Sequence, residues 1–346
     1  MLLFDILRSP EKKAYFRKCW DLQNDTGFRN WIMREYHNKG WVKIEDSDGA
    51  QRGDILYYIG EYGGNVGFFS EVIFTLFRLY YADDRGFIPY VNWGSNNLYY
   101  EPSGVDGEKN VFLYYFDQVT DIVSDKETAH MIRSTYDHIH ELQDQFDTHG
   151  YDISQQYMEC LSSMVRKYIH YNKKTQKYLD DEYMRLLGDK KTIAVHFRGT
   201  DYRRQYNNHP VFVTPEQEIE KVKALVDKGT YEQVFLATDE QAAIVEFQKA
   251  FGDRLKVFND VLRAGPDTDS VAYSHSNRVN HHYHLGLEVL RDQYMLTRCS
   301  ALVCGISNLT IVARLMRNAW YAPYEDLIVI NNGICRNDKV FADAVH

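Results

Sequence analysis

The segment Val195-His196-Phe197-Arg198-Gly199-Thr200-Asp201 contains the residues best suited to chemistry. It follows the apolar residues Ile193 and Ala194 and places a His, an Arg, a Thr and an Asp within a few positions of one another. A buried parallel strand that ends at a polar site has this pattern. The planar guanidinium of Arg198 can donate two hydrogen bonds to a phosphate, although a salt bridge at a strand end would have the same sequence signature.

Two more polar clusters follow strand-like runs. Thr238-Asp239 comes directly after the run 233–237, and Ser307-Asn308 comes soon after the run 301–304. Because the carboxyl ends of parallel strands face a common crevice, we expect both clusters to lie near Arg198 in one ligand site. Ser307-Asn308 also opens a helix, whose N-terminal N–H groups suit a phosphate. Asp239 is predicted either to bind a ribose or a base, or to cap the helix that follows it.

Strands and helices alternate in the second half of the chain, which predicts a parallel sheet with right-handed crossovers. The expected strands are 192–197, 233–237, 255–258, 301–304 and 327–330, and the expected helices are 214–228, 240–252, 285–298 and one that begins at 309. In the first half we expect strands at 54–59 and 87–91, helices at 68–81, 128–146 and 154–187, and a glycine-rich loop at 60–65.

The length of 346 residues exceeds one ordinary core and suits two domains of roughly 150 to 190 residues. The polar turn at 188–191 is the predicted boundary. The fold class is therefore predicted to be α/β, with an N-terminal domain of residues 1–188 and a C-terminal domain of residues 189–346.

The composition argues against several classes of function. The net charge is −9 with no dense Lys/Arg block, which argues against nucleic acid as a partner. The five cysteines form no CxxC pattern, which favours a reducing compartment. The apolar start is interrupted by Asp5, and no run approaches the ~20 apolar residues of a membrane span. We therefore expect a soluble, cytoplasmic protein without a transmembrane segment.

Two sequence features resemble metal sites. The DxD strings at 46–48 and 267–269 lie near glycines and are interpreted as solvated turns. His275, His281, His282 and His284 form a local cluster without a nearby cysteine, and we expect them to line a polar loop near the site. No metal is expected.

Several short motifs occur in the same order as in the α1,6-fucosyltransferases, both the N-glycan core enzymes and the rhizobial nodulation enzymes. They are 196–201, 237–240, Asn277-Arg278, 286–292 and 302–308, together with the glycine loop 60–65. The chain resembles this family over roughly residues 54–313, except for the middle of the first half. No single motif is specific enough alone, but their shared order is moderately specific.

The resemblance implies a glycosyltransferase of the GT-B type, with two Rossmann-like domains facing across a cleft. The C-terminal domain would bind the nucleotide sugar GDP-fucose, and the N-terminal domain would lie on the side of the glycan acceptor. His196, Arg198 and Asp201 would lie against the diphosphate and the fucose, with Thr200 counted among the donor-binding residues. The remaining implied donor residues are Asp239, Asp292, Ser307 and Asn308, with Gly63 and Gly64 approaching the diphosphate from the other domain. Acceptor contacts are expected around Asn92-Trp93 and Tyr99-Tyr100.

The chain departs from the family pattern at two positions. Gly199 stands where the family has a second arginine, and Tyr206 stands where it has an acidic residue. The predicted reaction is transfer of fucose to a glycan hydroxyl with inversion, catalysed by Arg198 and by Asp201 or His209 as the base. Two alternatives stay open: a noncatalytic nucleotide-sugar or glycan-binding protein on the same scaffold, and a transferase that uses another nucleotide sugar.

Overall fold

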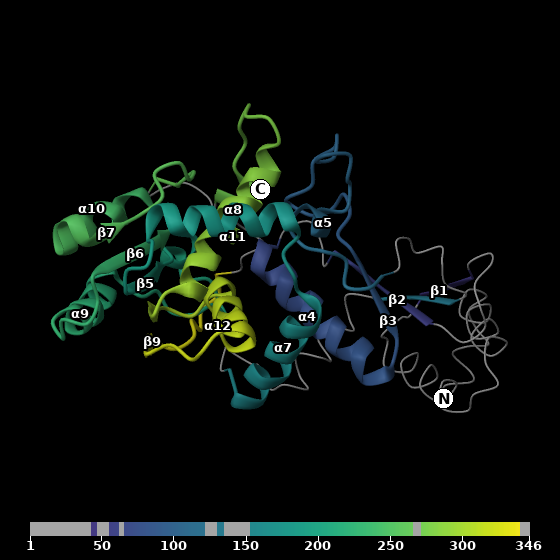
Figure 1. Ribbon diagram of the computed structural model, residues 1–346, viewed down its shortest axis with the longest axis horizontal. Coiled ribbons are helices and arrows are strands. Elements are labelled where there is room, and N and C mark those ends of the chain that lie inside the picture. Colours follow the sequence, from purple (N-terminus) through teal and green to yellow (C-terminus); the bar gives the residue numbers. More distant parts are fainter. Residues whose placement is uncertain are drawn as a thin grey trace.

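Two β-sheets with a layer of helices between them form the protein (Figure 1). The computed structural model describes residues 43–46, 55–61, 66–121, 130–134, 153–265 and 271–339. The α/β fold class expected from the sequence is confirmed. Among the helices described, none combines the length and apolar character required to cross a bilayer.

The second sheet is entirely parallel and has the strand order of a doubly wound fold. From edge to edge its strands are β7 (Leu255–Lys256), β6 (Gln233–Thr238), β5 (Thr192–Phe197), β8 (Ala301–Cys304) and β9 (Asp326–Val329). After β5, the next two strands in the chain, β6 and β7, lie on one side of it, whereas β8 and β9 lie on the other side. The strand order therefore reverses between β5 and β8. In such sheets ligands bind at this reversal, outside the carboxyl ends of the two strands.

Local signals in the sequence account for the helices of this half. They are α9 (Pro215–Val226), α10 (Gln241–Phe251), α11 (His281–Arg298) and α12 (Asn308–Trp320). Thr214 and Gln217 form a capping box at the start of α9, and Gly252 ends α10, as the sequence predicts. Helix α11 begins earlier than expected, at His281, and the third strand is shorter than expected, ending at Lys256.

The first sheet is mixed. Its strands lie in the order β1 (Lys43–Asp46), β4 (His130–Arg133), β2 (Ile55–Gly60) and β3 (Ile88–Asn92), with β1 antiparallel to β4 and the others parallel. The helix predicted over 128–146 is wrong at 130–133, because these residues pair with both β1 and β2. The other residues of that prediction, apart from Ser134, lie outside the described residues.

The helices of the first half are α4 (Phe68–Arg85), α5 (Val111–Tyr115), α7 (Gln155–Tyr168) and α8 (Lys173–Leu186). The single helix predicted over 154–187 is divided, because Asn172 caps α8 by accepting a hydrogen bond from the Thr175 N–H. Helix α4 extends beyond the predicted residue 81 to Arg85 and ends at Gly86, whose φ of 66° is left-handed and favours glycine.

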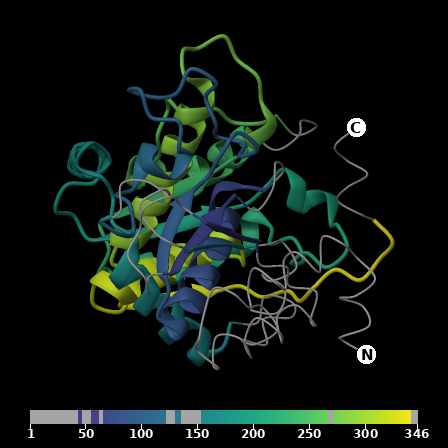
Figure 2. The same ribbon diagram turned by 90° about the vertical axis from the view of Figure 1, so that its right-hand side faces the viewer.

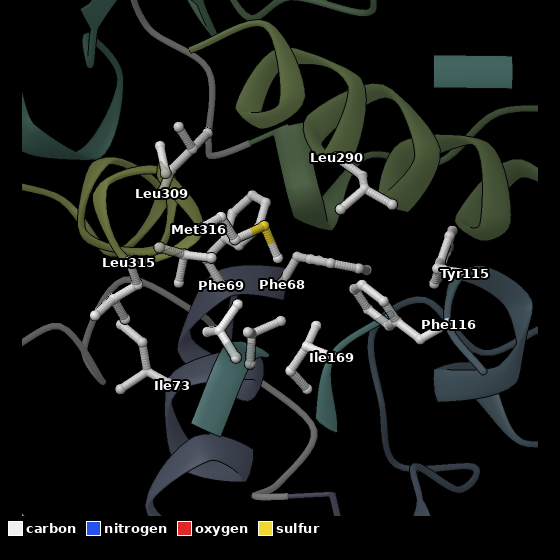
Figure 3. Close-up of a cluster of buried hydrophobic side chains, with 14 of the residues drawn as sticks. Phe68, Phe69, Ile73, Tyr115, Phe116, Ile169, Leu290, Leu309, Leu315 and Met316 are labelled. Atoms are coloured by element: carbon white, nitrogen blue, oxygen red, sulfur yellow. The ribbon is translucent and has the colours of Figure 1, made fainter. Parts of the chain in front are cut away.

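A continuous hydrophobic core joins helices from both halves of the chain (Figure 3). Phe68, Phe69 and Ile73 of α4 contribute to the same cluster as Leu315 and Met316 of α12. Burying each such side chain contributes about 1.5–3 kcal/mol. The predicted boundary falls in the turn between α8 and β5, while α4 and α7 before it pack against α12 after it. The division into domains 1–188 and 189–346 stays a prediction.

Candidate active site

A pocket of about 380 Å³ opens at the point where the strand order reverses between β5 and β8. This volume lies within the range of about 300–1,000 Å³ that is usual for small-molecule sites. Eight of the residues predicted from the sequence line it: His196, Arg198, Asp201, His209, Asp239, Asp292, Ser307 and Asn308. The structure thus brings together side chains that lie more than a hundred positions apart.

Arg198 is held between two carboxylates. Its Nη2 lies 2.9 Å from Asp201 Oδ1, and its Nη1 lies 3.2 Å from Asp239 Oδ2. Burial alone would lower the pKa of Arg198, but Asp201 and Asp239 raise it, so the guanidinium stays charged. Because a guanidinium has five N–H donors, Arg198 keeps donors for a ligand beside both ion pairs.

Asp239 organises the segment that follows β5. Its Oδ1 accepts a hydrogen bond from the Gly199 N–H at 2.9 Å, and the Thr200 hydroxyl lies 2.7 Å from its Oδ2. The alternative that Asp239 caps the next helix is wrong: the N-cap of α10 is Glu240, without a side-chain hydrogen bond. Thr200 is not among the pocket-lining residues, so contact between Thr200 and a donor stays a prediction.

Gly199 is explained by Glu240. A Cβ atom at position 199 would lie 1.9 Å from Glu240 Oε2, a distance that real Cβ contacts do not reach. Glu240 is 2% exposed and bonds the guanidinium of Arg203 with both oxygens, at 2.9 and 3.0 Å. The space beside Arg198 is therefore occupied by the carboxylate of Glu240, which forms an ion pair with Arg203, and not by a second arginine.

The pKa values of the titratable side chains in the pocket are shifted in different directions, so these side chains differ in protonation state. Burial, together with the charge of Arg198, lowers the pKa of His196 to about 3. Burial also lowers the pKa of His209, so both imidazoles are uncharged near neutral pH. Burial would raise the pKa of Asp201, but Arg198 outweighs it and lowers it. Burial raises the pKa of Asp292 to about 7.

Two helix N-termini meet at the pocket. Ser307 and Thr310 form a capping box at the start of α12. The Asn308 side-chain amide donates a hydrogen bond to the Ser70 hydroxyl in the first turn of α4, at 2.7 Å. Each N-terminus presents the positive end of the helix dipole, so together they favour a bound anion.

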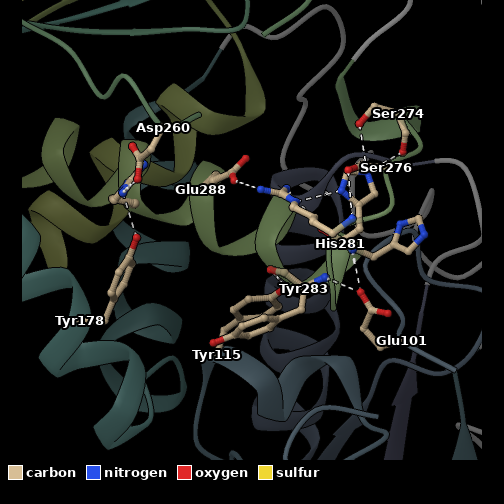
Figure 4. A network of polar contacts seen from close by, with 12 residues as sticks. Glu101, Tyr115, Tyr178, Asp260, Ser274, Ser276, His281, Tyr283 and Glu288 are labelled. Atoms are coloured by element: carbon tan, nitrogen blue, oxygen red, sulfur yellow. Dashed lines mark hydrogen bonds and ion pairs between the residues drawn. The ribbon is translucent and has the colours of Figure 1, made fainter. Parts of the chain in front are cut away.

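Helix α11 delivers Glu288 and Asp292 to the pocket and is itself capped from the first half of the chain (Figure 4). Glu101 Oε1 accepts hydrogen bonds from the N–H groups of His282 and Tyr283, at 2.7 and 3.1 Å. The carboxylate is favourable there because it faces the positive end of the helix. This cap, 181 positions away from His282, explains why α11 begins before the predicted residue 285.

Several lining residues were not predicted as donor-site residues from the sequence. They are aromatic, acidic or hydroxyl side chains: Ser70, Tyr99, Tyr202, Tyr273 and Glu288. Tyr99 was expected near the acceptor, and its hydroxyl accepts a hydrogen bond from the Phe68 N–H. Trp93, expected beside it, is 0% exposed in the core, and its indole N–H donates to Thr75. The acceptor contact expected from Trp93 is therefore wrong.

No metal site is found in the described part of the chain, where no group of three or more His, Cys, Asp or Glu side chains is placed to hold an ion. His281, His282 and His284 lie in α11 rather than in a loop, and His281 bonds Ser274 and Arg278 (Figure 4). Gly63, Gly64 and the string 267–269 lie outside the described residues, as do the last two residues of the string 46–48.

Comparison with known proteins finds similar solved structures. No protein-family model matches the chain, and no curated protein matches it. The chain is similar to NodZ α-1,6-fucosyltransferase soaked with GDP-fucose, at 16% identity and a TM-score of 0.44, over 76% of this chain and 93% of that one. Fucosyltransferase NodZ from Bradyrhizobium matches at 16% identity and a TM-score of 0.42, over 77% and 94%. POFUT1 in complex with GDP matches at 11% identity and a TM-score of 0.46, over 81% and 99%.

Proposed function

We propose that this protein is an inverting glycosyltransferase that transfers fucose from GDP-fucose to a hydroxyl group of a glycan. The observation that carries the proposal is the convergence of Arg198, at the end of β5, with the N-terminus of α12, after the end of β8, in one pocket. A guanidinium and a helix N-terminus are both strong partners for a diphosphate. Their position at the strand-order reversal is the usual one for a nucleotide.

The donor contacts follow from the protonation states of the lining groups. Arg198 would bind the diphosphate, and the uncharged His196 would lie beside it without adding to the positive charge. Asp292, with a pKa of about 7, is present in both protonation states at neutral pH. Its protonated form can donate a hydrogen bond to the nucleotide, and its ionised form can accept one. Apolar side chains such as Val261 and Val289 line the same pocket and suit the faces of a base or a sugar.

In the reaction, the acceptor hydroxyl oxygen attacks the anomeric carbon while the bond from that carbon to the diphosphate oxygen breaks. GDP leaves with the bonding electrons, and attack from the opposite face inverts the configuration. Positive charge develops on the sugar ring and negative charge on the leaving diphosphate. Arg198 and the N-terminus of α12 stabilise the negative charge, an effect often worth about 3–4 kcal/mol.

The acceptor's proton needs a base, and the pocket offers two. His209 is uncharged because burial lowers its pKa, so its imidazole can accept a proton. Asp201 is a weaker base, because Arg198 lowers its pKa and is bonded to it at 2.9 Å. We therefore assign the base to His209, with Asp201 orienting Arg198.

A noncatalytic nucleotide-sugar-binding protein is the second candidate. Glu240 occupies the space where a second arginine would extend from position 199, so the pocket has less positive charge for a leaving diphosphate. Such a protein would bind the donor without turning it over.

The test is a titration of the purified protein with GDP, GDP-fucose, GDP-mannose and UDP by calorimetry, followed by transfer assays on a panel of glycans. We expect GDP and GDP-fucose to bind, UDP not to bind, and fucose to be transferred. Arg198→Ala should abolish binding, Arg198→Lys should weaken it, and the exposed control Arg185→Ala should leave it unchanged.

The outcomes separate the candidates. Binding of GDP-fucose without transfer or hydrolysis supports the noncatalytic protein, and preferential binding of another nucleotide sugar changes the donor. The proposal would be refuted if none of the four ligands bound at about 1 mM, a concentration at which even weak sites are occupied.

A further inference from the structure

Glu218 is a buried acidic residue directly behind the proposed donor site. It lies in the first turn of α9, is 1% exposed, and its Oε2 has no hydrogen-bond partner among the described residues. Gly305 lines the same small cavity as Glu218, and its main-chain amide partly offsets the rise that burial causes in the pKa of the carboxyl group. Gly305 begins the turn that connects β8 to Ser307 and the N-terminus of α12.

A small second cavity connects Glu218 with the donor-binding residues. It has a volume of about 10 Å³ and so holds at most one water molecule. Besides Glu218, its lining includes His196, Arg198 and Ser307, which also line the large pocket. Ser307 Oγ lies 3.5 Å from His196 Nδ1, so these two residues contact each other at the front of the cavity.

The carboxyl group is costly for the fold. An acidic side chain with an unpaired oxygen in the interior loses its hydration, whereas an apolar side chain of similar size would not. Sequences tend to retain such local conflicts at functional sites. Burial raises the pKa of Glu218 well above its usual range, which favours the uncharged form of a carboxyl group close to Arg198.

We propose that Glu218 is a positioning residue for the donor site, which holds the turn from Gly305 to Ser307 and thereby places the N-terminus of α12 and His196 against the diphosphate. This inference rests on the proposed function, because the ligand it invokes is the diphosphate of GDP. Glu218 does not line the large pocket and acts only through the residues in front of it. Its effect is therefore on the geometry of the anion site and not on the chemistry itself.

The experiment compares Glu218→Gln, Glu218→Met and the control Glu220→Gln, an exposed residue of the same helix. Calorimetry measures the affinity for GDP, and thermal unfolding measures stability. Glu218→Gln keeps an uncharged acceptor for Gly305 and should bind GDP like the wild type. Glu218→Met should keep or raise the Tm but weaken GDP binding about 5- to 10-fold, the loss expected for one hydrogen bond that orders the site.

A purely structural role would move the Tm and leave the affinity of the folded protein unchanged. Equal GDP affinity in all variants, or an equal loss in Glu218→Gln and Glu218→Met, would overturn the proposal. If Glu218→Met does not fold, Glu218→Ala replaces it with the same expectation for affinity. A wild-type protein that does not bind GDP would instead refute the proposed function, so the two failures are distinguishable.

Discussion

The Asp239 carboxylate at the end of β6 holds the Arg198 guanidinium at the end of β5, with 3.2 Å between Oδ2 and Nη1. The same carboxylate accepts a hydrogen bond from the main chain of Gly199. Asp239 thus fixes both the side chain of Arg198 and the turn that follows it. Because β5 and β6 are adjacent parallel strands, this arrangement follows from their register, in which Phe197 pairs with Thr238.

Asp239→Asn tests this arrangement. The amide keeps one hydrogen-bond acceptor but loses the charge, so Arg198 retains only its ion pair with Asp201. We expect GDP affinity to fall about tenfold, because the guanidinium is less firmly oriented. Calorimetry measures the change, and Asp253→Asn, an exposed residue, is the control. Affinity within about twofold of the wild type would show that Asp239 does not orient Arg198.

Gly199→Ala should destabilise the protein, because the added Cβ would meet Glu240 Oε2 at 1.9 Å. We expect a loss of about 1–3 kcal/mol in the free energy of unfolding, measured by denaturant titration. Glu240→Gly removes the obstructing atoms at a helix N-cap, where glycine is accepted. The double variant should therefore lose less than the sum of the single variants, and strict additivity would contradict the proposed steric conflict.

Asp292 makes stability depend on pH. Burial raises its pKa from 3.8 to about 7, so the folded state binds the proton more tightly than the unfolded state does. The contribution of this proton binding to the free energy of unfolding is fully present below about pH 4 and is lost as the pH rises through about 7. Asp292→Asn, which cannot ionise, should therefore gain Tm relative to the wild type as the pH rises over this interval. A difference in Tm that does not change with pH would show that Asp292 does not titrate in this range.

The last described residues support the loop that carries His209. In Figure 2 they are the yellow segment that extends away from the rest of the fold toward the C-terminus. The Cys335 N–H donates to the His209 oxygen at 2.8 Å, and the Val211 N–H donates to the Gly333 oxygen at 2.8 Å. Truncation after residue 331 should lower kcat, because His209 loses its support, while GDP affinity changes little.

Steady-state transfer kinetics and calorimetry would separate these two effects. Truncation after residue 339 is the matched control, because it leaves the described pairing intact. An unchanged kcat in the variant truncated after residue 331 would show that the C-terminal pairing does not position His209.

Much of the second half could be predicted from the sequence, because its signals are local. The apolar run of β5 and its polar end, the capping box at Thr214, and the helix start at Ser307 each depend on a few adjacent residues. These signals, with the rule that parallel strands share one ligand edge, predicted one site for His196, Arg198, Asp201, Asp239, Ser307 and Asn308, and all six line the pocket. Asp292 was implied only by the family resemblance, and His209 was only a candidate base. The sequence by itself therefore determined where the site lies.

Only the tertiary structure decided what the individual residues do there. Asp239 follows a strand and precedes a helix, so the local pattern allows a cap, and its pairing with Arg198 depends on strand register. The early start of α11 depends on Glu101, and the glycine at 199 depends on Glu240, through contacts between distant positions. Strand β4 was mistaken for a helix for the same reason, since pairing with two neighbouring strands outweighs local propensity.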